Sequence, residues 1–254
     1  DRDPNSIRSV DGESPKGRVA GYALGDDYHD IVQARARSVL EEVQRIDPTS
    51  EGRCFVDTAP VLERELGQRA GLGWWGKNTC LINKHRGSAF FLAEIVTTAS
   101  LHVDRPATDH CGTCTHCLDA CPTDAFPEPY VLDARRCISY RTVELRGPIP
   151  RHLRSSMGEW IFGCDICQDV CPFNAPKLVE ITREPDLKAR EHVEGQLLIN
   201  LMEMDEVAWD NFSRGSALRR GKRAGFLRNV AVALGNWGSP AAVPALVRAL
   251  GDGE

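Results

Sequence analysis

One stretch organises this sequence: CGTCTHCLDACP at residues 111–122. It spaces four cysteines as C-x-x-C-x-x-C-x-x-x-C and ends in Pro122. A second stretch, CDICQDVCP at residues 164–172, adds three cysteines and a proline, and Cys137 lies between the two. A four-iron, four-sulfur (4Fe-4S) cluster takes four cysteine thiolates, and this spacing is typical of chains that bind such clusters. The eight cysteines therefore predict two 4Fe-4S clusters and low-potential electron transfer.

The spacing also predicts which cysteines share a cluster. Three closely spaced cysteines on a tight loop can point at one centre, whereas the cysteine just before proline cannot turn back and serves the other cluster. The first cluster is therefore assigned to Cys111, Cys114, Cys117 and Cys171. The second is assigned to Cys121, Cys137, Cys164 and Cys167. Zinc is the main alternative, but zinc sites use pairs of C-x-x-C. Two cysteines are left over, Cys54 and Cys80, and we expect them to be buried as small apolar side chains.

Composition places the chain among globular proteins. It has 254 residues, enough for two or three domains, with 42% hydrophobic and 26% charged residues. No apolar run reaches the roughly 18 residues needed to cross a bilayer, so no membrane partner is expected. The ten cysteines cluster at metal-ligand spacing, which indicates a reducing compartment instead of a disulfide-bonded secreted chain.

Charge is divided unevenly along the chain. Residues 1–210 carry 24 Lys and Arg against 34 Asp and Glu, a net −10. Residues 211–254 carry 7 against 2, a net +5, and no acidic residue occurs from 211 to 251. This asymmetry predicts a basic face at the C-terminal end that could meet a polyanion.

Hydrophobic periodicity and turn residues predict a mixed α+β chain that becomes helical toward its end. Helices are expected at residues 30–45, at 60–70 (closed by Gly71), and, after residue 197, at 226–234 and 241–250. Strands are expected at 54–56, 81–82 and 89–97. The last two helices, joined by a turn with Ser239 as N-cap, resemble one unit of a HEAT-type repeat.

Asp57 is the first candidate for catalysis. It stands at the end of the strand at 54–56, just before the helix expected from Pro60. One interpretation is a helix N-cap or first-turn acid. The other is a general acid, because a closed cleft flanked by Phe55 and Val56 would favour a protonated carboxyl that can deliver its proton.

Three further stretches carry a family resemblance: VDTAPVLER at residues 56–64, AGLGWWGKN at 70–78 and CISY at 137–140. Together with the cysteine motifs they resemble the epoxyqueuosine reductases, over essentially the whole chain. That family is bacterial, cytoplasmic and cobalamin-dependent, and it reduces epoxyqueuosine to queuosine at the wobble position of tRNA. The resemblance implies that Asp57 is the proton donor and that the clusters pass electrons to cobalamin.

The resemblance also implies an order of domains. Residues 1–104 would form a cobalamin-binding α/β domain, 105–178 a ferredoxin-like two-cluster domain, and 179–254 a helical HEAT-like domain, with further sequence expected beyond both ends. No D-x-H-x-x-G stretch offers a histidine to cobalt, in keeping with cobalamin bound base-off. The protein would act as a monomer on tRNA carrying epoxyqueuosine and take electrons from a donor such as flavodoxin or ferredoxin.

The remaining site residues follow from the same resemblance. The cobalamin cleft is expected near Gly71, Gly73 and Gly76, although a helix end and a tight turn would also explain these glycines. Candidate cofactor-binding residues are Tyr22, His29, Asp57, Lys77, Asn78 and Ser139. Candidate tRNA-backbone residues are Arg214, Arg219, Arg220, Lys222 and Arg223, which could equally form a solvated helix face.

Three other functions compete with this interpretation. A reductive dehalogenase shares cobalamin and two clusters, but the basic helical C-terminal region speaks against it. An electron carrier with an appended scaffold would need neither cobalamin nor Asp57. A tRNA-binding scaffold with structural clusters would bind without turnover.

Overall fold

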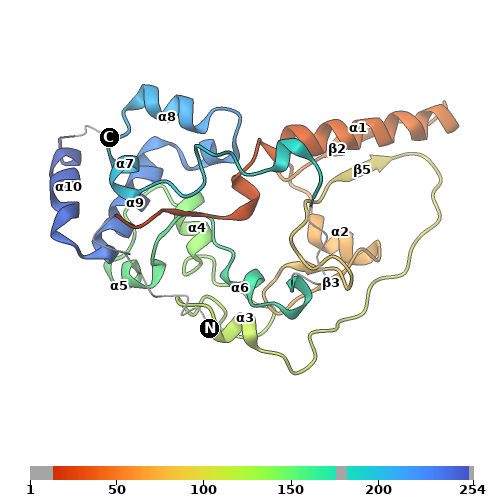
Figure 1. Cartoon of the computed structure of the whole chain (residues 1–254). Coiled ribbons are helices and arrows are strands. Elements are labelled where there is room, and N and C mark those ends of the chain that lie inside the picture. The colour runs from red at the N-terminus through yellow and green to blue at the C-terminus, as the bar shows by residue number, and fades with distance from the viewer. Residues whose placement is uncertain (1–13, 176–181, 252–254) are drawn as a thin grey trace.

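The computed structural model describes residues 14–175 and 182–251 (Figure 1). Its α-helices are α1 Tyr28–Ile46, α2 Glu63–Arg69, α3 His116–Asp119, α4 Ile138–Val143, α5 Arg151–Arg154, α6 Ile166–Asp169, α7 Leu198–Met202, α8 Glu206–Ser213, α9 Arg223–Trp237 and α10 Val243–Ala249. Its strands are β1 Arg18–Val19, β2 Gly52–Phe55, β3 Trp74–Trp75, β4 Leu81–Ile82, β5 Glu94–Thr97 and β6 Trp160–Phe162. Short 3-10 helices are η1 Gly21–Ala23, η2 Ser155–Met157, η3 Pro172–Asn174, η4 Pro185–Leu187, η5 Ala217–Gly221 and η6 Pro240–Ala242.

The strands in the described residues form three two-stranded pairs. β1 runs parallel to β6, whereas β2 pairs antiparallel with β5, and β3 with β4. The β1–β6 pair joins the start of the described chain to the segment just before the second cysteine motif. Between β5 and α3 the chain runs along one side of the molecule without regular structure (Figure 1).

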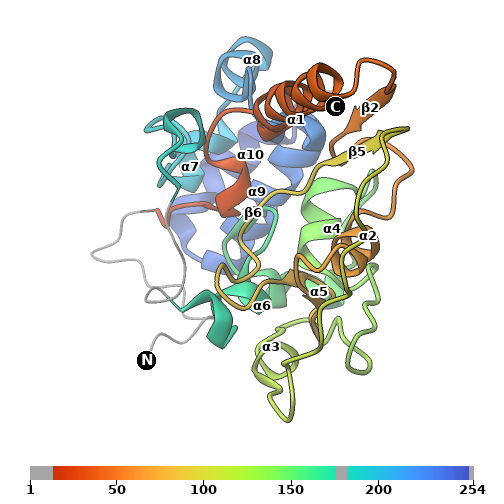
Figure 2. The same cartoon turned by 90° about the vertical axis from the view of Figure 1, so that its right-hand side faces the viewer.

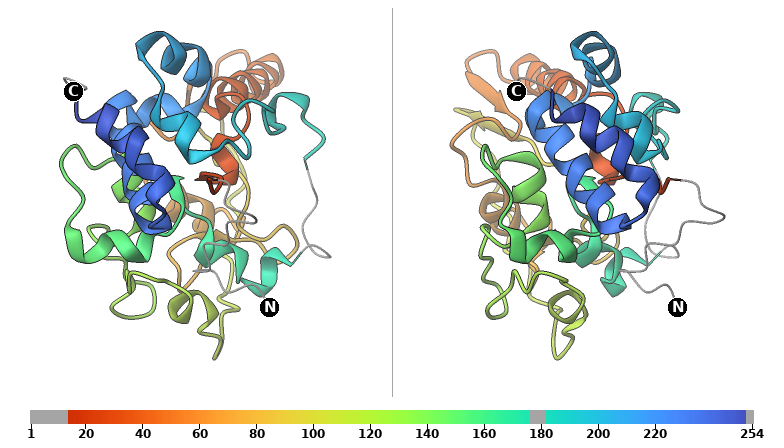
Figure 3. Two further views of the ribbon diagram at one scale, coloured as in Figure 1. Left: turned by 60° about the vertical axis from the view of Figure 1, so that its left-hand side comes forward. Right: turned by 90° about the vertical axis from the view of Figure 1, so that its left-hand side faces the viewer.

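One hydrophobic core draws on all three predicted segments. It contains Tyr28 and Val56 from the first segment, Phe162 from the second, and Phe226 and many neighbours from the third. α9 lies against α7, α4 and β6, and α10 lies beside α9 (Figure 3). The division of the chain at residues 104 and 178 stays a prediction.

Asn229 of α9 ties this core together. Its side chain is fully buried and its Nδ2 donates to the carbonyl oxygens of Thr142 in α4 and Ile161 in β6, at 2.8 Å each. A buried amide is stable only when its hydrogen bonds are made, so these contacts specify how the last helices sit on the cysteine segment.

Local sequence explains most element boundaries. α1 begins where the side chain of Asp27 accepts from the backbone N–H of His29, and it ends before Pro48. Gly71, with φ +72°, follows the end of α2 as expected. The Ser239 side chain accepts from the N–H of Ala241, the predicted cap.

Several predicted boundaries differ from the structure, and three of them have a physical reason. The helix expected from Pro60 begins at Glu63, because the preceding residues form the loop that carries Asp57. The strand expected over 89–97 is confined to β5, since its partner β2 has only four residues. The helix expected over 241–250 starts as the 3-10 turn η6 before α10.

The two cysteine motifs meet at α3 and α6. α3 and α6, which follow the first cysteines of each motif, pack against each other. Figure 2 shows α3 at the opposite end of the molecule from α8, with α2 and β5 between them. The two chemistry-bearing regions of the sequence are therefore supported by the same fold.

Candidate functional site

The structure brings the first group of four cysteines around one cavity. The thiols of Cys111, Cys114, Cys117 and Cys171 line it. Cys171 belongs to the second motif, so the fold places it with the three cysteines that spacing assigns to the same cluster. Burial raises the pKa of Cys117 to about 11. Cationic iron can replace the protons of such thiols, because ligand binding and deprotonation are coupled.

Hydrogen bonds and loops support this first group. Trp74 Nε1 donates to Cys111 Sγ at 3.4 Å. Lys77 is buried, and its Nζ donates to the carbonyl oxygens of Gly112 and Cys114 at 2.7 and 2.9 Å. The amine of Lys77 therefore holds the cysteine loop, and its expected place beside cobalamin stays a prediction.

Asn78 and the glycines are likewise part of the cysteine region. Asn78 lines the same cavity, and its Nδ2 donates to the carbonyl oxygen of Cys167 at 3.2 Å. A side chain at Gly73 or Gly76 would collide with Ile82 of β4. These glycines thus permit close packing of β3 on β4, and the turn interpretation accounts for them without a corrin.

The thiols of the second group of four cysteines lie near enough for their charges to act on one another. Burial raises the pKa of Cys164 to about 12, with the charges of Cys137 and Cys121 acting on it as well. Burial also raises the pKa of Cys137, whose sulfur accepts backbone hydrogen bonds from Tyr140 and Ser139. Ser139 therefore contributes its main chain to a cysteine at the start of α4.

Cys80 is partly buried beside the second group of cysteines. Interaction with Cys167 is the main cause that lowers the pKa of the Cys80 thiol. The other cysteine outside the two groups, Cys54, lies in β2 opposite Ile95.

Two observations test whether these residues suit 4Fe-4S clusters. The four cysteines of the first group line one cavity, and a four-iron cube takes its thiolates around such a space. Arg141, one helical turn after Cys137, is 3% exposed, yet its Nε and Nη1 have no hydrogen-bond partner in the protein. Buried N–H groups without partners are rare, and cluster sulfurs are suitable acceptors.

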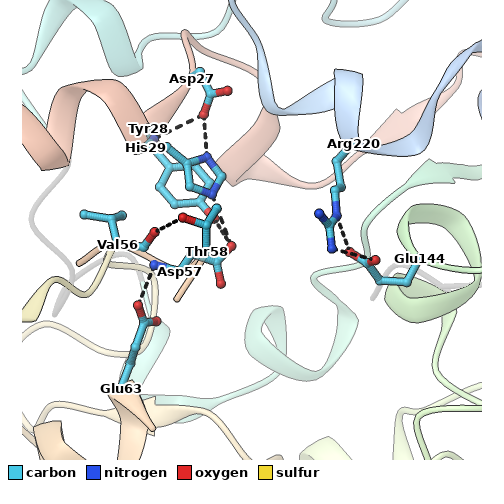
Figure 4. Close-up of polar contacts among 9 residues, drawn as sticks. All are labelled: Asp27, Tyr28, His29, Val56, Asp57, Thr58, Glu63, Glu144 and Arg220. Carbon is cyan, nitrogen blue, oxygen red and sulfur yellow. Dashed lines mark hydrogen bonds and ion pairs between the residues drawn. The ribbon is translucent and has the colours of Figure 1, made fainter. Parts of the chain in front are cut away.

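Asp57 stands on a strained loop (Figure 4). It follows β2 and has φ +53°, a conformation that few residues other than glycine adopt. Its backbone N–H donates to Glu63 Oε1 at 2.5 Å, and the N–H of Thr58 donates to the carbonyl oxygen of Val56 at 2.6 Å. Asp57 is not a helix cap, because α2 begins six residues later.

Side chains at the start of α1 surround the Asp57 carboxyl. Tyr28 Oη donates to Asp57 Oδ2 at 2.7 Å, and His29 Nε2 lies 3.2 Å from the same oxygen. Tyr28 stacks between His29 and Phe91, and the ring of Tyr22 meets its edge. The carboxyl remains 58% exposed, so the described residues do not form the closed cleft expected around it.

Across the open side of Asp57, Arg220 and Glu144 form a bidentate ion pair of 2.9 and 3.0 Å (Figure 4). Hydrogen bonding to Glu144 is the main reason that the pKa of Arg220 is raised, and the charge of Asp57 adds to it. This cation therefore contributes to the field at Asp57, a role for which the sequence held no signal because the two residues are 163 positions apart.

Comparison with known proteins supplies the family. Residues 110–174 match the model of a 4Fe-4S double cluster binding domain, and residues 3–58 match "Epoxyqueuosine reductase QueG, DUF1730". An epoxyqueuosine reductase from Xanthomonas campestris is 49% identical over 86% of the chain. Another, from Escherichia coli K12, is 45% identical over 88% of the chain. The chain belongs to the epoxyqueuosine reductase family. It spans about three-fifths of the length of these relatives, namely 61% and 59%.

Solved epoxyqueuosine reductases share the fold. One of them, with an epoxyqueuosine-modified tRNA-Tyr stem loop, is 32% identical and has a TM-score of 0.86. The match covers 97% of this chain and 64% of that solved chain. Another, from Bacillus subtilis, has its aspartate catalytic loop swung out of the active site. It is 28% identical over 99% of this chain and 66% of its own, with a TM-score of 0.89.

The basic residues that are candidates for binding the tRNA backbone differ in exposure. Arg214 and Arg219 both pair with Asp210 and remain largely exposed, as does Arg220. Arg223 is only 10% exposed at its side chain, and its guanidinium donates to the carbonyl oxygen of Met204. A phosphate-binding role for Arg223 is therefore not supported.

The positive charge at the C-terminal end of this reductase-family chain is partly neutralised in the folded structure, because acidic residues pair with it. Two acidic residues pair with its basic stretch. Asp210 lies just before the stretch and pairs with Arg214, whereas Glu144 pairs with Arg220 from 76 residues away. Lys222 is exposed, in a left-handed backbone conformation at the start of α9. In the parts of the chain that are described, no helix has the length and apolar character required to cross a membrane.

Proposed function

We propose that this protein reduces epoxyqueuosine in tRNA to queuosine. Electrons from a low-potential donor such as flavodoxin or ferredoxin would enter through two 4Fe-4S clusters, and cobalamin bound base-off would complete the path. The protein would act as a cytoplasmic monomer. Support comes from the relatives' activity and from the solved relative that holds a modified tRNA stem loop.

The proposal depends on one observation. The same fold contains Asp57, an acidic residue on a strained loop, and two groups of four cysteines. Strain of this kind persists where the surrounding structure enforces it, often at reaction sites. We assign to Asp57 the role of the aspartate on the relative's catalytic loop. The exposure of its carboxyl leaves one side open to a substrate.

The residues around Asp57 suit cobalamin without a histidine ligand. His29 is beside the site, but both of its ring nitrogens face carboxylates, so it has no free nitrogen for cobalt. When bound, cobalamin would supply the two-electron reduction of the epoxide. The chain's own contribution is positioning and proton transfer.

The proton balance defines what Asp57 must do. Converting an epoxide into an alkene and water consumes two electrons and two protons. Asp57 would give a proton to the epoxide oxygen as its carbon–oxygen bond breaks, which prevents charge from building on that oxygen. The second proton allows the oxygen to leave as water.

The exposed basic residues fit a polyanionic substrate. Arg214, Arg219, Arg220 and Lys222 would contact the tRNA backbone, where arginine forms bidentate bonds with phosphate. Each bound phosphate would displace an internal carboxylate such as Asp210 or Glu144.

The test is turnover of the natural nucleoside. The protein is reconstituted anaerobically with iron, sulfide and cobalamin, reduced, and incubated with epoxyqueuosine-containing tRNA, and the wobble nucleoside is analysed by mass. We expect queuosine from the wild-type protein and a loss of at least about 10²-fold for Asp57→Asn. An electron carrier or a tRNA scaffold would yield no queuosine, and a dehalogenase would act on a halogenated compound instead.

A further inference from the structure

Asp57 belongs to a chain of three ionisable side chains. His29 Nδ1 lies 2.6 Å from Asp27 Oδ1, and His29 Nε2 lies 3.2 Å from Asp57 Oδ2 (Figure 4). The imidazole thus bridges two carboxylates, one at the start of α1 and one on the Asp57 loop. Proton transfer through a histidine requires a partner on each ring nitrogen, and both partners are present.

Asp27 fixes which nitrogen carries the permanent hydrogen. Its Oδ1 also accepts the backbone N–H of His29 at 3.1 Å, so the helix cap and the ring contact use one oxygen. A carboxylate at Nδ1 holds the hydrogen there, which leaves Nε2 to exchange a proton with Asp57. The stack of Tyr28 on His29, with ring centroids 4.1 Å apart, fixes the plane of the imidazole.

Tyr28 cannot take the same role. It donates to the same oxygen of Asp57, but burial, followed by that hydrogen bond, raises its pKa far above the ordinary range of a tyrosine. Tyr28 therefore keeps its hydrogen and orients the carboxyl. His29 and Asp27 are each 29% exposed, so solvent can reach the relay.

We propose that His29, oriented by Asp27, resupplies Asp57 with protons. This inference rests on the proposed function, which requires two protons for each epoxide reduced while Asp57 holds one. After Asp57 has protonated the oxygen, the imidazolium of His29 gives its Nε2 proton to the Asp57 carboxylate and becomes the neutral Nδ1–H imidazole. Water then returns a proton to Nε2, and Asp27 keeps the hydrogen on Nδ1 throughout.

The experiment uses the reconstituted protein in the queuosine assay, with kcat and KM for tRNA measured separately. His29→Ala should lower kcat by about 10²-fold and change KM by less than about twofold, because His29 does not bind tRNA. Added imidazole should restore at least about tenfold of the lost rate. Asp27→Asn should lower kcat by roughly tenfold, since the ring loses its orientation.

Two control variants separate a relay from a structural effect. Tyr28→Phe also removes a partner of Asp57 but leaves the relay intact, so imidazole should not change its rate. His152→Gln replaces an exposed histidine of α5 and should match the wild-type protein. If His29→Ala fails to retain its clusters, His29→Gln, which keeps the size and polarity of the side chain, should show the same fall in kcat.

Three results would overturn the relay. The first is a His29→Gln variant with wild-type kcat. The second is a fall in the kcat of His29→Ala that added imidazole does not relieve, together with an equal fall in the kcat of Tyr28→Phe. The third is a wild-type protein that makes no queuosine, which removes the proposed function and the relay together. The first two leave the proposed function in place, so the two failures are distinguishable.

Discussion

Glu94 offers the sharpest test of how the Asp57 loop is held. It begins β5 opposite Phe55 of β2, and burial, followed by the charge and hydrogen bond of Glu63, raises its pKa to about 7. Its Oε2 is buried without a partner. Because Glu63 also accepts the backbone N–H of Asp57, an ionised Glu94 places a second negative charge beside the residue that anchors the loop.

The sign of the pH dependence follows from this raised pKa. Below about pH 4.5 Glu94 is protonated in both the folded and the unfolded chain, and its contribution to folding is fully present. Between pH 4.5 and 7 the unfolded chain loses the proton while the folded chain keeps it, so stability falls as pH rises. Above pH 7 the penalty is complete.

The magnitude can be worked from the same values. A rise in pKa from 4.5 to about 7 corresponds to about 3 kcal/mol. Solvent screening of a carboxyl that is only partly buried reduces this to about 1–2 kcal/mol. Glu94→Gln removes the titration, so relative to the wild-type protein it should gain about 1–2 kcal/mol of stability between pH 5 and pH 8, or roughly 3–6 °C in melting temperature.

The assay is anaerobic thermal unfolding of the cluster-loaded protein at a series of pH values. Comparing variants at each pH cancels the titration of every other group. Glu65→Gln, an exposed residue of α2, is the matched control and should give a difference independent of pH. If the difference between Glu94→Gln and wild type is also constant from pH 5 to 8, the carboxyl pair does not exist and the account of the loop is wrong.

Four other predictions test the cysteine groups and their surroundings. Cys171→Ala should remove the same cluster as Cys111→Ala, shown by matching electron paramagnetic resonance spectra of the remaining cluster; different spectra would refute the shared cavity. Trp74→Phe should lower the reduction potential of that cluster by on the order of tens of millivolts, because an N–H···S bond to Cys111 stabilises the reduced state. Arg220→Ala should weaken tRNA binding and reduce the salt slope by about one, and an unchanged slope would exclude a phosphate contact. Asn229→Leu should cost about 2–3 kcal/mol of stability, measured by denaturation, because two buried carbonyls lose their donor.

Much of the chemistry could be predicted from spacing. Residue types at fixed short intervals specify what a loop can ligate, and a proline after the last cysteine indicates that this ligand turns away. The fold accordingly brings Cys171 to the cavity lined by Cys111, Cys114 and Cys117. Long helices such as α1 and α9 were also predictable, because caps and periodicity act within a few residues.

The surroundings of Asp57 could not be predicted in the same way. His29 and Asp57 are 28 residues apart and Arg220 is a further 163 away, so only packing of α1, β2 and the last helices brings them together. For the same reason the contact of Lys77 with the cysteine loop could not be predicted. Ligand spacing is a property of neighbouring residues, whereas the partners and exposure of a side chain depend on which distant segments share its core.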